Sequence, residues 1–227
     1  LSPAERAAEA RATMIELEWL TKRMIDHVAV NLSKDIDSGY DTMDVNKTVL
    51  DTIRMMVEYE NAKIGKCKTQ DEIDAQTEVY VDKQNEMAGY QAIELCIDVV
   101  SVGNPTLPAP APLVLIEAAL KCGQSLLAGG NATVQKGLAK KLTSKPSDAF
   151  YLAAREYLRG REHSLVHERE MRKKGTIVDE DGTQAFSNHV IEFLRLWCEG
   201  HNLEMQDLLR VQEDNKKEIN LIDQVCS

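Results

Sequence analysis

The chain has 227 residues, of which 43% are hydrophobic and 28% charged, a balance typical of a folded domain rather than a disordered one. Its formal net charge of −10 at pH 7 argues against nucleic acid or an anionic membrane as the main partner, because both would repel it. The longest apolar stretch, 113–120, contains Glu117 and is too short to span a bilayer, and the charged Glu5 and Arg6 argue against a signal peptide.

The first hundred residues read as a run of amphipathic helices. Ser2 and Pro3 form a helix start that leads into an apolar stripe ending near Gly39, with Leu17, Leu20, Met24 and Val28 at helical spacing. A second helix is predicted after Asp44, with its inward face made by Val45, Val49, Ile53, Met56 and Val57. Thr69 and Glu72 form a capping box that opens a more polar helix. From about residue 86 another apolar stripe is predicted, carried by Ile93, Leu95, Ile97, Val99 and Val100.

A proline-rich segment, "VGNPTLPAPAPL" at 102–113, divides the chain, and because prolines remove backbone donors we predict an extended connector there. Beyond it a helix runs to Gly129-Gly130, and Asn131 caps a short helix over 132–142. Ser147 caps the next helix, whose inward face is predicted to hold Phe150, Ala154, Tyr157, Leu158 and Leu165 and which stops at Gly175. A polar loop at 176–187 and helices at about 188–199, 203–212 and 216–226 complete the chain.

This pattern predicts an all-α fold of about eight or nine helices, either an armadillo-like α-solenoid or an irregular helical bundle. No strict repeat of 34 or 42 residues is present, so a solenoid would be degenerate. We expect an N-terminal helical layer at 1–101, a connector at 102–112 and a C-terminal layer at 113–227.

The five cysteines are an odd number without a CxxC pair, which favours a reduced, cytosolic chain. Cys67 lies between Lys66 and Lys68, which would favour its thiolate, but an exposed and inert thiol is the preferred interpretation over a redox sensor.

Signatures of enzymes are absent: there is no phosphate loop, no GxSxG, no HExxH and no zinc-spaced Cys/His cluster, so we do not expect an enzyme. His163 and His167 share a helical face and could bind zinc together, as a metalloenzyme would require, but a solvated, salt-bridged face explains them with fewer assumptions. The segment "VDEDGTQAF" at 178–186 fails as an EF-hand at the first and last ligand positions and is predicted to be a turn.

The segment "EGHN" at 199–202 interrupts an amphipathic stretch, with Gly200 as a helix stop and Asn202 as a helix start. Glu199 then lies at the negative end of a helix dipole, beside carbonyl groups that lack partners within the helix. A carboxylate beside free carbonyl oxygens is part of the ligand set of a hard cation such as Ca²⁺, although one carboxylate cannot build a site.

Two segments, "LLAGGNATVQ" (126–135) and "FLRLWCEGHNLEMQDLLRVQ" (193–212), resemble the inositol-trisphosphate and ryanodine receptors, in the helical region called the RyR/IP3R-homology-associated domain. "TVLDTIRMMVEYENAKIG" and "VDKQNEMAGYQAIELCIDVVS" look more like the inositol-trisphosphate branch, which we favour, whereas "VDEDGT" is closer to the ryanodine receptors. Trp197 departs from the family pattern, which has a smaller aliphatic residue there.

The resemblance implies a cytosolic, armadillo-like segment of a homotetrameric calcium-release channel on the cytoplasmic face of the endoplasmic reticulum. Such a segment relays ligand-induced change toward the pore and contacts other domains of the channel. Glu199 occupies the position of a calcium-binding glutamate, with His201 as a neighbour, and the second carboxylate lies outside this chain. No cofactor is expected in isolation, with Ca²⁺ as a regulatory ligand of the full channel. The alternative is a generic α-solenoid scaffold without metal dependence.

Overall fold

The computed structural model describes residues 3–32, 40–108, 110–144, 148–173, 182–212 and 219–226, and this part of the chain contains ten α-helices and no strand. The all-α prediction is confirmed. In chain order the helices are α1 (Pro3–Asn31), α3 (Tyr40–Ile64), α4 (Gln70–Gly89), α5 (Ala92–Val102), α6 (Leu113–Leu127), α7 (Ala132–Ser144), α8 (Asp148–Lys173), α9 (Gly182–Trp197), α10 (Leu203–Leu208) and α11 (Leu221–Cys226).

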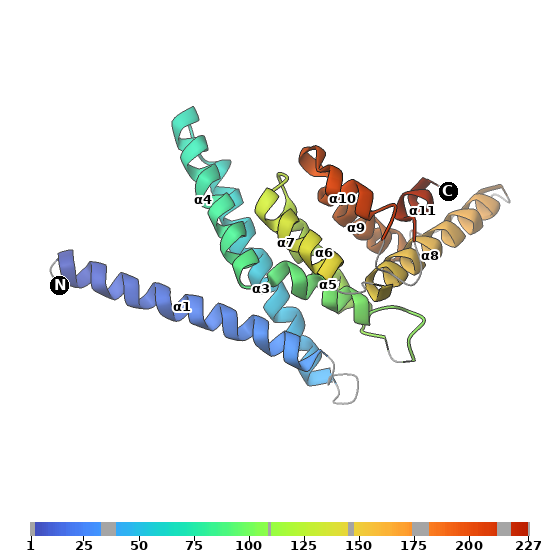
Figure 1. The fold of residues 1–227 in the computed structure, drawn as a ribbon, viewed down its shortest axis with the longest axis horizontal. Helices are drawn as coiled ribbons and strands as arrows, with labels where there is room; N and C mark the ends of the chain where they lie inside the picture. Colours follow the sequence, from blue (N-terminus) through green and yellow to red (C-terminus); the bar gives the residue numbers. More distant parts are fainter. Residues whose placement is uncertain are drawn as a thin grey trace.

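After α1, the helices form three stacked units of three (Figure 1). The first unit is α3–α4–α5, the second α6–α7–α8 and the third α9–α10–α11. Helix α6 packs against both α3 and α9, α7 against both α4 and α10, and α8 against both α5 and α11. Each layer of the stack therefore takes one helix from every unit, which is the arrangement of an armadillo-like solenoid. Because α6 packs on α3 and α5, the core continues across the proline-rich connector.

Helix α1 joins this stack only through its C-terminal part. Ile25 and Val28 are buried where α1 packs against α3 and α5, whereas residues 11–20 are exposed and the helix projects from the body in Figure 1. Of the predicted stripe, Val28 is buried and Met24 half-buried, but Leu17 and Leu20 are each 49% exposed. The apolar periodicity predicted the helix correctly, but it did not show which part of the helix packs against other helices.

Several predicted helix boundaries are confirmed by their caps. The Thr69 hydroxyl accepts from the Glu72 amide (3.2 Å) while the Glu72 carboxylate accepts from the Thr69 amide (3.2 Å), which completes the capping box. Asn131 caps α7 through its side-chain oxygen, which accepts from the amides of Thr133 (3.0 Å) and Val134 (3.2 Å). In α8 the predicted inward residues 150, 154, 157 and 158 are buried, while the side chain of Leu165, the cap at Ser147 and the stop at Gly175 lie outside the described residues.

Other boundaries were predicted wrongly. The helix at 86–100 is broken at Gln91, whose left-handed backbone (φ 65°) separates α4 from α5. The second helix starts at Tyr40, and Val45 is 47% exposed rather than inward. Residues 182–187 are helical rather than part of a loop, because Phe186 and Ser187 are buried as the first turns of α9 pack into the core. Helices α10 and α11 are shorter than predicted.

The proline-rich connector is a closed loop rather than an extended segment. Its ends meet where the Ala111 amide donates to the Val102 carbonyl (3.0 Å), and the Asn104 side chain accepts from both the amide (3.0 Å) and the hydroxyl (2.9 Å) of Thr106. The Tyr157 hydroxyl of α8 donates to the Gly103 carbonyl. The prolines prevent a helix, as predicted, but these hydrogen bonds turn the loop back so that α6 can pack on α5.

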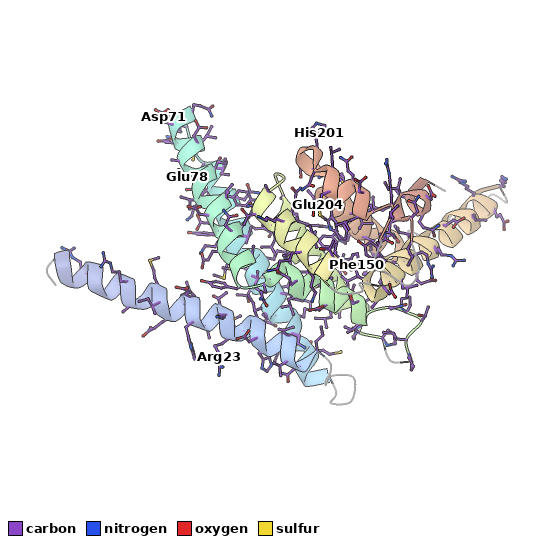
Figure 2. The ribbon with its side chains drawn as sticks, in the orientation of Figure 1. Arg23, Asp71, Glu78, Phe150, His201 and Glu204 are labelled. Atoms are coloured by element: carbon purple, nitrogen blue, oxygen red, sulfur yellow. The ribbon has the colours of Figure 1, made fainter. Side chains whose placement is uncertain are left out.

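Trp197, at the end of α9, is an aromatic anchor of the core. Its side chain is fully buried, stacks on Phe150 of α8 (ring centroids 5.3 Å apart) and meets Phe193 edge to face (5.6 Å). Figure 2 shows Phe150 in the interior, where α8 approaches the neighbouring helices. The large residue at this position is thus accommodated by aromatic packing between the second and third units.

Replacement of Trp197 by Ala is expected to destabilise the chain by about 3 to 5 kcal/mol, because it removes a buried aromatic ring and leaves a cavity. The measurement is the free energy of unfolding from urea titration followed by circular dichroism. Trp19→Ala is the matched control, because Trp19 is 61% exposed on α1, and it should cost less than about 1 kcal/mol. Equal effects of the two substitutions would contradict the anchoring role.

Candidate functional site

The "EGHN" segment is a tight corner between α9 and α10, as predicted. Helix α9 ends at Trp197, and Glu199–His201 form one turn of 3-10 helix. Gly200 (φ 74°) and His201 (φ 60°) are both left-handed, and the Asn202 side chain then caps α10 by accepting from the Met205 amide (3.2 Å). A left-handed conformation is ordinary for Gly200 but costs energy at His201, so surrounding contacts have to hold the corner in this shape.

The corner between α6 and α7 has the same build. Gly129 (φ 83°) and Gly130 (φ 71°) are left-handed, and Asn131 caps the helix that follows. Asn131 and Asn202 are 71 positions apart, and so are Gln135 and Gln206, each four residues beyond its asparagine. The second and third units therefore share a sequence repeat, Asn-x-x-x-Gln after a left-handed pair, that was not recognised from the sequence.

A glutamine from the preceding unit holds each corner, an arrangement called here the amide clamp. Gln135 of α7 is 2% exposed and donates from Nε2 to the carbonyls of Trp197 (3.1 Å) and Glu199 (2.9 Å). Its Oε1 accepts from Asn202 Nδ2 (2.9 Å). The clamp satisfies carbonyls that have no partner at the end of α9 and ties the third unit to the second.

The same clamp joins the first and second units. Gln84 of α4 donates from Nε2 to the carbonyls of Ser125 (3.0 Å) and Ala128 (2.9 Å), and its Oε1 accepts from Asn131 Nδ2 (3.0 Å). Ala128 is the counterpart of Glu199 in the 71-residue repeat, so the two clamps share this carbonyl position. The corner that carries Glu199 is thus one of two built alike.

Glu199 differs from its counterpart in having a carboxylate at this position. The side chain is half-buried and lines an open pocket of about 450 Å³ between α3, α4, α6 and α9. Its Oε2 atom is buried and has no hydrogen-bond partner. A buried carboxylate oxygen without a donor is costly, and this is the strongest sign in the corner that a further group belongs there.

The other two carboxylates of this pocket are already paired. Glu58 accepts from the Ser125 hydroxyl (3.0 Å) and lies 3.6 Å from Arg54 Nη1. Glu192 accepts from Arg195 Nε and Nη2 (2.8 Å each), and the Arg195 hydrogen bond holds the pKa of Glu192 below its usual value. Glu199 is therefore the pocket carboxylate that keeps an unused buried oxygen.

The charge on Glu199 is felt across the pocket. Burial raises the pKa of the Tyr80 hydroxyl, and the negative charges of Glu199 and Glu58 raise it further. The pKa of Arg195 is raised mainly by its hydrogen bond to Glu192, with a smaller contribution from Glu199. Both directions follow from the negative charges of these carboxylates, which share the pocket wall with the cationic side chains of Arg54, Lys121 and Arg195.

Of the other candidate ligands, those that the structure describes do not line this pocket. His201 is exposed and absent from the pocket wall, and Figure 2 places it at the outer tip of the corner. The side chains of His163 and His167 lie outside the described residues, as do residues 178–181, whereas 182–186 begin α9 instead of forming the predicted turn. Cys67 is half-buried, and its thiol donates to the Lys63 carbonyl (3.5 Å). In the part of the chain that the structure describes, no three His, Cys, Asp or Glu side chains are grouped as metal ligands.

The third unit also carries the match to a known family. The family model described as RyR and IP3R Homology associated matches residues 182–227, which comprise α9, the Glu199 corner, α10 and α11. This match supports the RyR/IP3R family. That family consists of channels rather than enzymes. Within the described ranges, no helix combines the length and the apolar character needed to cross a bilayer.

The amide clamp can be tested by replacing Gln135 with Leu, which leaves two carbonyls and the Asn202 amide without partners. We expect a loss of roughly 1 to 3 kcal/mol in the free energy of unfolding, because buried polar groups become unsatisfied. Gln206→Leu is the matched control at the equivalent position of the repeat, and it should change stability by less than about 0.5 kcal/mol. The measurement is urea unfolding, and a neutral Gln135→Leu would exclude the clamp as a source of stability.

Proposed function

We propose that this chain is a regulatory and coupling segment of an intracellular calcium-release channel and that Glu199 contributes part of an activating Ca²⁺ site. The observation that carries this proposal is the buried, unpaired Glu199 oxygen at a corner that lies inside the family match. We favour the inositol-trisphosphate receptor branch, a homotetrameric channel, and a position on the cytoplasmic face of the endoplasmic reticulum.

The residues present fit a half-site for Ca²⁺. Ca²⁺ takes six to eight oxygen ligands, whereas Glu199 offers one unpaired buried carboxylate oxygen, and its own carbonyl is occupied by Gln135. A second carboxylate from outside this chain is therefore required. When bound, Ca²⁺ would supply the positive charge that allows two carboxylates to approach each other.

The role of this chain is to hold Glu199, its half of the site, in place and to transmit a displacement of Glu199 to the other helices. Gln135 and Asn202 fix the backbone on either side of Glu199, so a pull on Glu199 acts on α7 through the clamp. Helix α7 begins at Asn131, which the second clamp ties to Gln84 of α4. Cation binding at Glu199 thereby biases the placement of all three units, by as much as the affinity for the cation differs between placements.

Contacts with other domains of the channel would then carry this bias toward the pore. The generic scaffold without metal dependence remains the alternative, because it shares the fold and would use the same units. The calcium-regulated function requires the negative charge of Glu199, whereas the scaffold function does not.

In the intact channel, Glu199→Gln is expected to shift calcium activation to higher concentration by roughly tenfold or more, because a charged ligand is replaced by a neutral one of the same shape. The measurement is channel open probability, or calcium release from vesicles, as a function of free Ca²⁺. Glu204→Gln is the matched control, because Glu204 is exposed on α10, and it should leave the activation curve in place. An unshifted curve for Glu199→Gln would support the scaffold instead.

The isolated chain should not bind Ca²⁺ below about millimolar concentration, because one unpaired carboxylate supplies too few ligands. Isothermal titration calorimetry with CaCl₂ measures this directly, with the Glu199→Gln chain as the reference. Tight binding that Glu199→Gln abolishes would show that the site is complete within this chain and would contradict the half-site.

A further inference from the structure

The outer face of the third unit carries an apolar groove of about 350 Å³. Little polar surface is exposed in it, and Arg195 of α9 is its charged lining residue. The other walls come from α9, α11 and the residues that follow α9 and α10: Ile191, Leu194, Cys198, Leu209, Leu221, Ile222 and Val225. Val225 at its edge is 46% exposed. The capping units of solenoids carry a polar outer face, whereas this groove is lined mainly by apolar side chains.

The 71-residue repeat shows what this surface is equivalent to. Ile191, Leu194 and Arg195 of α9 and the following Cys198 occupy the positions of Leu120, Gly123, Gln124 and Leu127 of α6. That face of α6 receives α9: a Cβ atom at Gly123 would lie 2.4 Å from Phe193, and Gln124 donates to the His189 carbonyl (2.8 Å). The groove on α9 is therefore the counterpart of a surface that already binds a helix.

The amide clamp has a matching open position. Gln206 of α10 is the counterpart of Gln135, which clamps the corner docked on the second unit. Gln206 is half-buried, and its side chain makes no hydrogen bond to any residue that the structure describes. Gln206 lies on α10, the helix after α9, just as Gln135 lies on α7, the helix after α6.

We propose that the outer face of α9, α10 and α11 docks a further helical hairpin of the same kind, with the hairpin's first helix in the apolar groove and its corner held by Gln206. The occupant is recognised by its chemistry: an amphipathic helix, a corner with free carbonyls, and a capping asparagine that donates to the Gln206 side-chain oxygen. This inference involves no calcium and goes beyond the proposed channel function.

A second copy of this chain fits the face less well. Its corners at Gly129–Asn131 and Gly200–Asn202 are already clamped from within. The equivalent corner of the first unit, between α3 and α4, has no left-handed residue among 65–69, and the Thr69 cap is satisfied by Glu72 of the same helix. The first unit of another copy therefore cannot offer the corner that Gln206 is placed to hold.

Thiol labelling tests the docking, because Cys198 is half-buried and lines the groove while Cys67 is half-buried at the distant α3–α4 corner. The rate of maleimide labelling of each cysteine is measured by peptide mass spectrometry. It is compared between the purified chain and the native protein isolated from the cells that produce it. Cys198 should react about tenfold more slowly in the native protein, because the docked hairpin has to open first, and Cys67 should react equally in both. Equal Cys198 rates would overturn the proposal.

Two variants sharpen this test without altering the buried core. In the native protein, Gln206→Ala and Val225→Lys should each restore fast Cys198 labelling, while both purified chains keep the thermal unfolding midpoint of the parent. Protection of Cys198 in the purified chain that grows with concentration, together with a dimer in sedimentation, would instead assign the face to a second copy and overturn the proposal.

The chemistry of the occupant is read by a benzophenone photo-crosslinker placed at Val225. The linked peptide should come from a helical hairpin with an asparagine cap, and the yield should fall in the Gln206→Ala background. A crosslinker at Val81 on the first unit, 37% exposed, serves as the position control. Crosslinks to lipid, or to a segment without such a corner, would contradict the proposal.

Discussion

The hydrogen bonds that Gln135 makes to the Trp197 and Glu199 carbonyls satisfy the end of α9 and tie the third unit to the second. A helix end leaves carbonyl groups without partners, and a stack of short helices has many such ends to bury. One buried amide answers this by donating to the carbonyls and accepting from the capping Asn202. Because this amide belongs to the preceding unit, the hydrogen bonds that satisfy the carbonyls at a helix end also join the two units. Gln84 repeats the arrangement one unit earlier.

This construction explains why Glu199 sits in an unusual environment. Its carbonyl is held by Gln135, which fixes the backbone from which the side chain leaves. The side chain instead faces a pocket where the other two carboxylates have partners and it has a buried oxygen without one. The counterpart residue, Ala128, has the same clamped carbonyl and no charge. The scaffold is thus shared by both corners, and only the corner of the third unit carries a carboxylate at this position.

The clamps also give the three units the character of a mechanical series. Each unit is tied to the next through the end of one helix and the start of another, positions at which a small rotation moves a whole helix. Aromatic packing of Trp197 against Phe150 and Phe193 resists such rotation by filling the space between units. The proposed coupling role requires units that are joined in this way, and the apolar outer face of the third unit is where we propose that a further hairpin docks.

The sequence by itself determined the helices, because periodicity, prolines and caps act over a few residues. It placed the corners at Gly129–Asn131 and Gly200–Asn202 and the capping box at Thr69. Only the tertiary structure decided the rest, because those outcomes depend on residues that are distant along the chain. It broke the helix at Gln91, turned the connector back on itself, began α9 at Gly182, and left Leu17 exposed although its spacing equals that of a core residue. Above all, it brought Gln84 and Gln135 to corners more than forty residues away, which no local pattern specifies. The Asn-x-x-x-Gln repeat was present in the sequence, but its meaning lies in contacts between units.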